Sequence, residues 1–224
     1  MEGSGKITPY AEVYLRLDNE VDLYMTKLDL MLKSSETCAH VTVKSTLFYP
    51  WKLSEIPHTK PLDKIYNEIL RQIEDEKISL EYVIDIPKNK PRKVCRDLVK
   101  ILNDARIIAT LSNKCPLREG AYEVRALMAD HHDFNIFLLD PTDIVILDMA
   151  GRVGLLLISS TLLREANIIF EEIWNRAIPL ISRERPYVNE ENFINILESV
   201  SPPENEKKEV LDAIRRLKGI LNQL

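Results

Sequence analysis

The stretch HHDFNIFLLD, from His131 to Asp140, decides the fold that this sequence predicts. Residues 134 to 139 are apolar except for Asn135, which suits a strand that is covered on both faces of its sheet. The polar residues before this run, and the Asp140-Pro141 pair after it, are typical of turns. We therefore expect a central strand that ends at Asp140 and returns along the sheet as a hairpin.

The elements expected around this strand change character along the chain. Strands at 40–48, 78–86 and 106–111 alternate with helices that open at Pro61 and Pro91, and alternation of this kind predicts parallel strands joined by crossovers. Strands at 122–128, 134–139, 144–147 and 153–158 then follow one another, which predicts antiparallel pairs. A helix capped by Ser159 or Ser160 runs on to Ala177. The expected fold is α/β, with an α+β mixed sheet in a single domain.

Both ends of the chain carry apolar residues at alternating steps of four and three. The positions that we expect to form interaction seams are Tyr10, Tyr14, Leu17, Val21 and Leu28 near the start, and Val210, Ile214, Leu217 and Leu221 near the end. Such spacing indicates either a short coiled coil between two copies or a helix packed on its own domain. We expect an N-terminal helix over 1–36, the α/β domain over 37–182, and a C-terminal helical extension over 183–224.

Composition limits the classes of function. The chain has 224 residues, 45% of them apolar, and a formal net charge of -5. A cluster of cations at Lys88, Lys90, Arg92, Lys93 and Arg96 could contact nucleic acid. The acidic net charge argues against that role for this chain alone. Three cysteines without pairing spacing fit a reducing compartment, and neither a leader nor a long apolar run is evident, so we expect a cytoplasmic protein without a membrane span.

The segment from Val41 to Ala177 resembles one half of the phospholipase D-like fold. The family's H-x-K-x4-D signature would fall on Asp133, Asn135 and Asp140, and only Asp140 matches it. The helix that ends in Ile173-Trp174-Asn175-Arg176-Ala177 is similar to the one that follows the signature in that family. The nearest likeness is to the sensor domain of archaeal TrmB-type transcriptional regulators, in which a coiled-coil helix precedes the domain. The chain leaves no room for that family's winged helix-turn-helix before Tyr10.

The departures from the signature bear on catalysis. The resemblance implies a histidine nucleophile and a lysine that stabilises charge on the phosphate, and here these positions hold Asp133 and Asn135. The family's Gly-Ser pair is replaced by Leu147 and Asp148. Asp148, like Asp140, also looks like a carboxylate ligand, but aspartates at turns more often bond their own backbone. We therefore expect no catalytic residue, no metal and no cofactor.

Three functions follow from these patterns. The first is a non-catalytic binding or regulatory module, in transcriptional regulation if the likeness holds, which forms a homo-oligomer and takes a ligand or protein partner. The second is a residual phosphodiesterase or nuclease, with His131 or His132 acting across a homodimer. The third is a nucleic-acid-binding accessory protein that uses the cations from Lys88 to Arg96. The lost signature favours the first.

Overall fold

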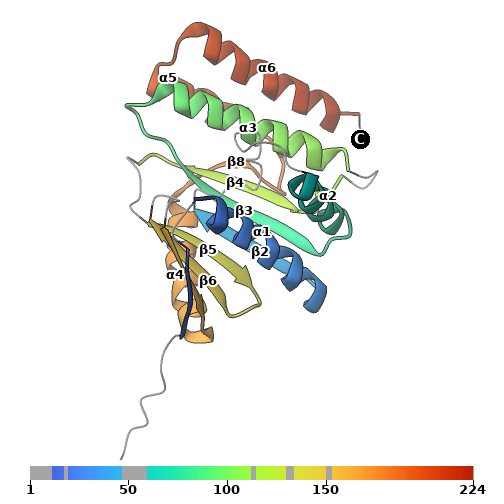
Figure 1. The fold of residues 1–224 in the computed structure, drawn as a ribbon. Helices are drawn as coiled ribbons and strands as arrows, with labels where there is room; N and C mark the ends of the chain where they lie inside the picture. Colours follow the sequence, from blue (N-terminus) through green and yellow to red (C-terminus); the bar gives the residue numbers. More distant parts are fainter. Residues whose placement is uncertain are drawn as a thin grey trace, which may run out of the picture.

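The computed structural model describes residues 12–17, 20–46, 60–111, 115–129, 134–149 and 153–223. Within these ranges eight strands form one mixed sheet in the order β1-β7-β6-β5-β2-β3-β4-β8 (Figure 1). The strands are β1 (Glu12–Leu17), β2 (Val41–Thr46), β3 (Ile78–Asp85), β4 (Tyr122–Leu127), β5 (Phe134–Asp140), β6 (Ile144–Met149), β7 (Val153–Ile158) and β8 (Ile178–Ile181). The helices are α1 (Glu20–Thr37), α2 (Lys60–Glu74), α3 (Pro91–Ala109), α4 (Ser160–Arg176), α5 (Glu190–Val200) and α6 (Glu204–Leu221).

The sheet combines a parallel half and an antiparallel half, which confirms the expected α/β mixed fold. Strands β2, β3 and β4 run parallel, and β5 joins them antiparallel to β2. Strands β5, β6 and β7 then form an antiparallel meander. The expected central strand is therefore β5, which lies between β6 and β2.

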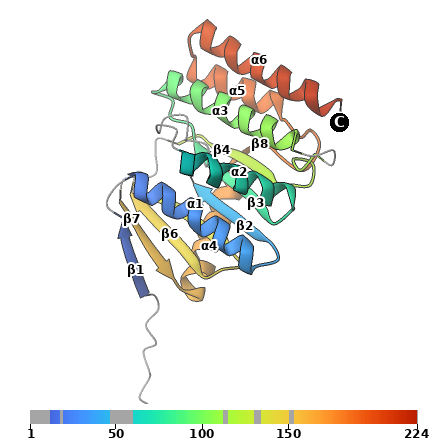
Figure 2. The ribbon, with the colours of Figure 1, turned by 45° about the vertical axis from the view of Figure 1, so that its right-hand side comes forward.

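The helices divide unequally between the two faces of the sheet. Helices α1, α2 and α3 cover one face, and α5 and α6 lie against α3 as an outer layer (Figures 1 and 2). Helix α4 covers the opposite face through Leu163, Ala166 and Phe170, which pack against β3, β5 and β6. Its first turn begins as predicted, because the Ser159 side chain accepts a hydrogen bond from the Leu162 N–H at 3.2 Å.

The prediction of one N-terminal helix through Tyr10, Tyr14 and Leu17 is wrong. Tyr14 and Leu17 lie in β1, and Tyr10 falls outside the described residues. Strand β1 pairs with β7 and forms the edge of the sheet, so its backbone finds ladder partners that a helix would not need. A run containing Val13, Tyr14 and Leu15 suits a strand as well as a helix, and the available sheet edge decides between them.

The remaining seam residues lie on helices of the chain's own core. Val21 is in α1, and Leu28 of the same helix is fully buried. The C-terminal seam is buried as well, in the cluster that contains the inner face of α3; its members are Val210, Ile214, Leu217 and Leu221. Two arrangements were expected for the heptad-like helices, a coiled coil between copies or packing on the chain's own domain. In the described structure, the C-terminal helix packs on its own domain.

Two further expectations differ from the structure. The apolar run from Arg106 was predicted to be a strand, but α3 continues to Ala109. Strand β8, which pairs with β4, was not expected. A short apolar run fits the interior of a helix as well as a strand, so its neighbours decide. Among the described residues, no helix combines the length and the apolar character needed to cross a bilayer.

Candidate functional site

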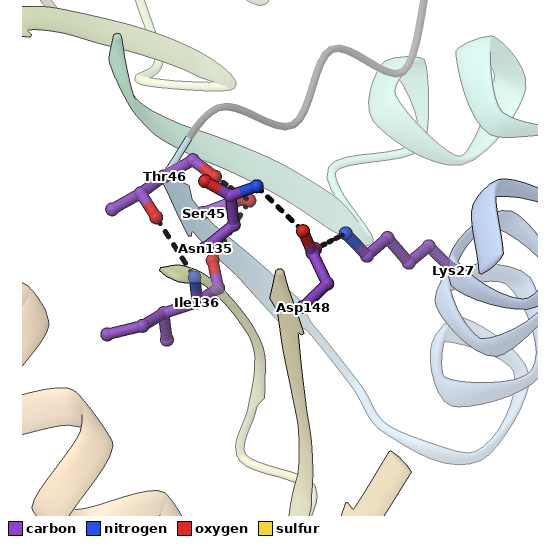
Figure 3. A network of polar contacts seen from close by, with 6 residues as sticks. All are labelled: Lys27, Ser45, Thr46, Asn135, Ile136 and Asp148. Atoms are coloured by element: carbon purple, nitrogen blue, oxygen red, sulfur yellow. Dashed lines mark hydrogen bonds and ion pairs between the residues drawn. The ribbon is translucent and has the colours of Figure 1, made fainter. Parts of the chain in front are cut away.

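A buried polar network lies at the end of the sheet where β2 stops and β5 begins (Figure 3). Asn135 of β5 and Asp148 of β6 are direct cross-strand partners in the register of the meander. Strand β2 ends beside them at Thr46, and α1 contributes Lys27 from the covering layer. The carboxyl ends of parallel strands are where open α/β sheets usually bind ligands, so this edge is a reasonable place for a site.

The Asp148 carboxylate is the centre of the network. Lys27 donates from Nζ to Oδ2 across 2.5 Å, and Asn135 donates from Nδ2 to Oδ1 across 2.7 Å. The lysine ammonium also lies 5.4 Å from the centre of the Phe137 ring. All three polar residues are buried, with relative exposures of 4% for Lys27, 6% for Asn135 and 1% for Asp148. The charges compensate each other, so the network adds no net charge to the site.

Burial makes this network dependent on both charged partners. Removing two charges from water costs several kcal/mol each, and their attraction offsets that cost only when geometry and hydrogen bonding are good. Here each Asp148 oxygen has a donor, and the ammonium faces both a carboxylate and an aromatic ring. Loss of a single partner would leave a buried charge uncompensated.

The side chains at the end of β2 complete the hydrogen bonding next to the network. The Ile136 N–H donates to Thr46 Oγ1 at 2.9 Å, and the Ser45 hydroxyl donates to the Ile136 carbonyl at 3.1 Å. These bonds lie just beyond the last backbone pair of the two strands, Ser45 with Phe137. The start of β5 is therefore tied to β2 by side chains where the backbone ladder stops.

One acceptor in the network is unsatisfied. Within the described part of the chain, the Oδ1 atom of Asn135 is buried and has no hydrogen-bond partner. Such an atom costs about 1–3 kcal/mol, so a water molecule or a ligand donor would be stabilising there. An anion would not, because an amide oxygen is itself an acceptor.

The structure separates the residues of the degenerate signature. Asn135 joins the buried network, whereas Asp140 lies at the other end of β5, opposite Thr42. Five residue steps along the strand separate these two positions by about 17 Å. Asp133, His131 and His132 lie outside the described residues.

Two members of the network were not identified as such from the sequence. Asp148 was interpreted as a turn residue, but it lies within β6 and is fully buried. Lys27 had no signal, since 121 positions separate it from Asp148. Drawing β5 and β6 as a hairpin places Asp148 opposite Asn135, and that pairing could have identified Asp148 from the sequence.

No protein-family model matches the chain, and no curated protein matches it in sequence. Among solved structures, it is similar to TrmBL2, an archaeal chromatin protein whose structure is described as showing a novel mode of DNA binding. The TM-score is 0.43 and the sequence identity 14%, over 75% of this chain and 53% of that one. The chain thus spans about half the length of that structure. A similarity of this size does not assign a family.

A second buried polar group lies on α3, away from the network. Asp104 is 5% exposed, and burial raises the pKa of its carboxyl well above the usual range, while Lys100 and a hydrogen bond with Tyr122 oppose that rise. Burial, followed by the Asp104 charge, raises the pKa of Tyr66 to about 12. The pKa values of Tyr24 and Tyr82 are shifted in the same direction, and by burial first. Around Asp104, burial therefore favours the neutral forms of the carboxyl group and of the tyrosine hydroxyls.

The predicted cation cluster is partly compensated by acidic residues. Lys93 pairs with Asp97 at 2.8 Å, and Arg92 pairs with Glu206 of α6 at 3.4 Å. A cavity of about 580 Å³ between α3 and α6 is lined by these cations together with Glu206 and Glu209. Carboxylates among the cations weaken the attraction of this surface for a phosphate backbone. Within the described ranges, no group of three or more potential ligands could hold a metal ion.

Proposed function

We propose that this chain is a non-catalytic binding and regulatory module, built on a degenerate phospholipase D-like domain of the kind found in TrmB-type regulators. The observation that carries the proposal is the hydrogen bond between Asn135 and Asp148, with Lys27 on the other carboxylate oxygen. The position where the family's signature has a cationic lysine therefore holds a neutral amide bound to a carboxylate.

The electrostatics of this network do not suit phosphoryl transfer. A phosphodiesterase needs positive charge directed at the phosphoryl oxygens, which gain charge in the transition state. The nearby ammonium of Lys27 is bound to Asp148, and the buried Asn135 Oδ1 is an acceptor. A phosphate placed here would meet a carboxylate and an amide oxygen. These contacts support binding of a hydrogen-bond donor rather than turnover of a phosphodiester.

A phosphodiesterase assay tests the proposal directly. Bis(4-nitrophenyl) phosphate is incubated with the wild-type chain and with the His131→Ala and His132→Ala variants. We expect all three to match the buffer rate. Hydrolysis by the wild type that is lost in either variant would contradict the proposal and favour the alternative of a homodimeric phosphodiesterase.

We propose further that regulation is exerted through a ligand or protein partner, and not through direct contact of this chain with DNA. Its net charge of -5 and the acidic residues among its α3 cations support this. A gel-shift experiment with duplex DNA at about 50 mM salt, where phosphate contacts are strongest, should show no complex. A protein–DNA complex that disappears as the salt concentration is raised would contradict the proposal that this chain does not contact DNA directly.

Assembly into a homo-oligomer is part of the proposal. The C-terminal seam is buried within the chain, so a second copy would have to contact other apolar side chains. The large apolar side chains exposed in the described structure are Ile168 and Ile169 of α4 and Leu155 and Ile158 of β7. Light scattering after size exclusion gives the oligomeric state, and an Ile168→Glu/Ile169→Glu variant tests whether α4 contributes. A wild type that stays monomeric at high protein concentration would contradict this part.

A further inference from the structure

A cation-lined cavity lies at the end of the molecule near the C-terminal turn of α6, remote from the Lys27–Asp148 network. Its volume is about 580 Å³, in the range of small-molecule pockets. The turn before β4 contributes Arg118, the loop after β8 contributes Arg185, Pro186 and Tyr187, and α6 contributes Lys218 and Leu221. Three segments far apart in sequence thus bring three cations to one cavity.

The positive charge of this cavity exceeds its negative charge. Lys218 forms an ion pair with Glu190 of α5. In the described part of the chain, neither Arg118 nor Arg185 forms an ion pair with a carboxylate. Among the described residues, two of the arginine charges that line the cavity thus have no carboxylate partner.

Arg118 is held in place by neutral groups. Its Nη2 donates to the Leu221 carbonyl at 2.7 Å, and its guanidinium lies 5.6 Å from the centre of the Tyr187 ring. Its Nε is buried and has no partner within the described residues. Capping the C-terminal end of α6 explains the bond to Leu221. That end carries only about half a unit of negative charge, which is less than the charge of one arginine.

Arg185 and Tyr187 line the cavity from the loop after β8. The Arg185 guanidinium lies 5.9 Å from the Tyr187 ring centre, so two arginines share one aromatic ring. Like-charged guanidinium groups near one ring are stabilised by an anion that can accept from both of them. Pro186 and Leu221 provide apolar surface beside them.

We propose that this cavity binds a small organic phosphate monoester. The dianionic group accepts hydrogen bonds from Arg185 and Lys218 and supplies the countercharge that Arg118 lacks, and the organic part contacts Pro186 and Leu221. Guanidinium groups match phosphate oxygens in geometry, and the cavity is larger than an inorganic phosphate requires. Such a site is additional to the proposed function, because none of these residues belongs to the polar network.

Isothermal titration calorimetry on the full chain tests the site with phenyl phosphate, inorganic phosphate and phenol. We expect phenyl phosphate to bind most tightly, inorganic phosphate to bind at least tenfold more weakly, and phenol to give no heat. Equal affinity for phenol and phenyl phosphate would overturn the role of the anion. Equal affinity for inorganic phosphate would overturn the role of the apolar surface.

Variants locate the binding within the cavity. Arg185 is exposed, so Arg185→Gln should leave the fold intact and weaken phenyl phosphate binding at least tenfold. Arg215→Gln is the matched control, since Arg215 lies on α6, outside the residues that line this cavity, and pairs with Asp212. An Arg185→Gln variant that binds like wild type, or a control that loses binding equally, would overturn the assignment. A negative result here would leave the phosphodiesterase test unaffected.

Discussion

Lys27 of α1 donates to the carboxylate of Asp148 in β6 across 2.5 Å, in a part of the core where both side chains are nearly inaccessible to solvent. This contact links α1 to the end of the sheet where β2 stops and β5 begins. It also gives the Asp148 carboxylate a bound cation.

The Lys27→Met variant tests how strongly the fold depends on this pair. We expect it to lower the free energy of unfolding by about 3–5 kcal/mol, because it leaves the Asp148 charge buried without its partner. Urea denaturation followed by circular dichroism measures the loss. Lys33→Met is the matched control on the same helix, since Lys33 pairs with Asp29 at the surface, and it should cost less than about 1 kcal/mol. Equal losses in the two variants would contradict the expectation.

The Asp104→Asn variant should change how stability depends on pH. Because burial raises the pKa of Asp104, the folded chain keeps a proton that the unfolded chain releases near pH 4. This group's contribution to stability is therefore complete below about pH 4 and declines as the pH rises toward the folded-state pKa. We expect the variant to have a higher Tm than wild type above pH 7 and a difference that shrinks toward pH 4.

Thermal melts at several pH values check this, with Asp29→Asn as a surface control. Asp29 lies on α1 and is largely exposed. A stability difference for Asp104→Asn that is constant from pH 4 to pH 8 would show that proton release from this carboxyl is not what destabilises the fold.

Two glycine substitutions should have opposite effects. A Cβ at Gly154 of β7 would clash with Leu23 Cδ1, so Gly154→Ala forces α1 or the Leu23 side chain to shift. We expect a loss of about 1–3 kcal/mol from overpacking. Gly219 lies in α6, where an added Cβ would meet no described atom within 4 Å, so Gly219→Ala should stabilise by about 0.5–1 kcal/mol. Chemical denaturation measures both, and recovery of Gly154→Ala by Leu23→Ala would identify the clash.

Truncation of the C-terminal seam should affect folding rather than assembly. Ile214 of α6 is fully buried, so Ile214→Ala should cost about 2–5 kcal/mol. Arg216→Ala, at an exposed position on the same helix, should cost less than about 0.5 kcal/mol. Denaturation curves at two protein concentrations separate the possibilities. If the denaturation midpoints of wild type and Ile214→Ala both shift with protein concentration, and by different amounts, Ile214 lies in an interface between copies.

Much of the architecture follows from local patterns. The alternation of strands and helices predicted the parallel pair of β2 and β3, and the run of short strands after Gly120 predicted the meander from β5 to β7. The strand expected at 106–111 is helical, and β4, which was expected to pair antiparallel, runs parallel to β3. Helix α4 begins at its predicted serine cap. These features depend on residues a few positions apart, where period and capping chemistry act directly.

The errors arose where a distant segment decided the outcome. Residues 12–17 have a spacing that fits a helix, yet they form β1 because the edge of β7 supplies partners for their backbone. Arg106 to Ala109 have the composition of a strand, yet they extend α3, whose inner face continues into the core. Local propensities differ by less than the free energy of such long-range packing.

For the candidate site, the sequence alone placed Asn135 at the start of a central strand, and the structure confirms that strand as β5. Only the tertiary structure brought Lys27 to Asp148 and gathered Arg118, Arg185 and Lys218 around one cavity beside α6. Periodicity describes how side chains point along one element, but a buried ion pair depends on how separate elements pack. The net charge of this site therefore depends on folding, which brings residues 121 positions apart into contact.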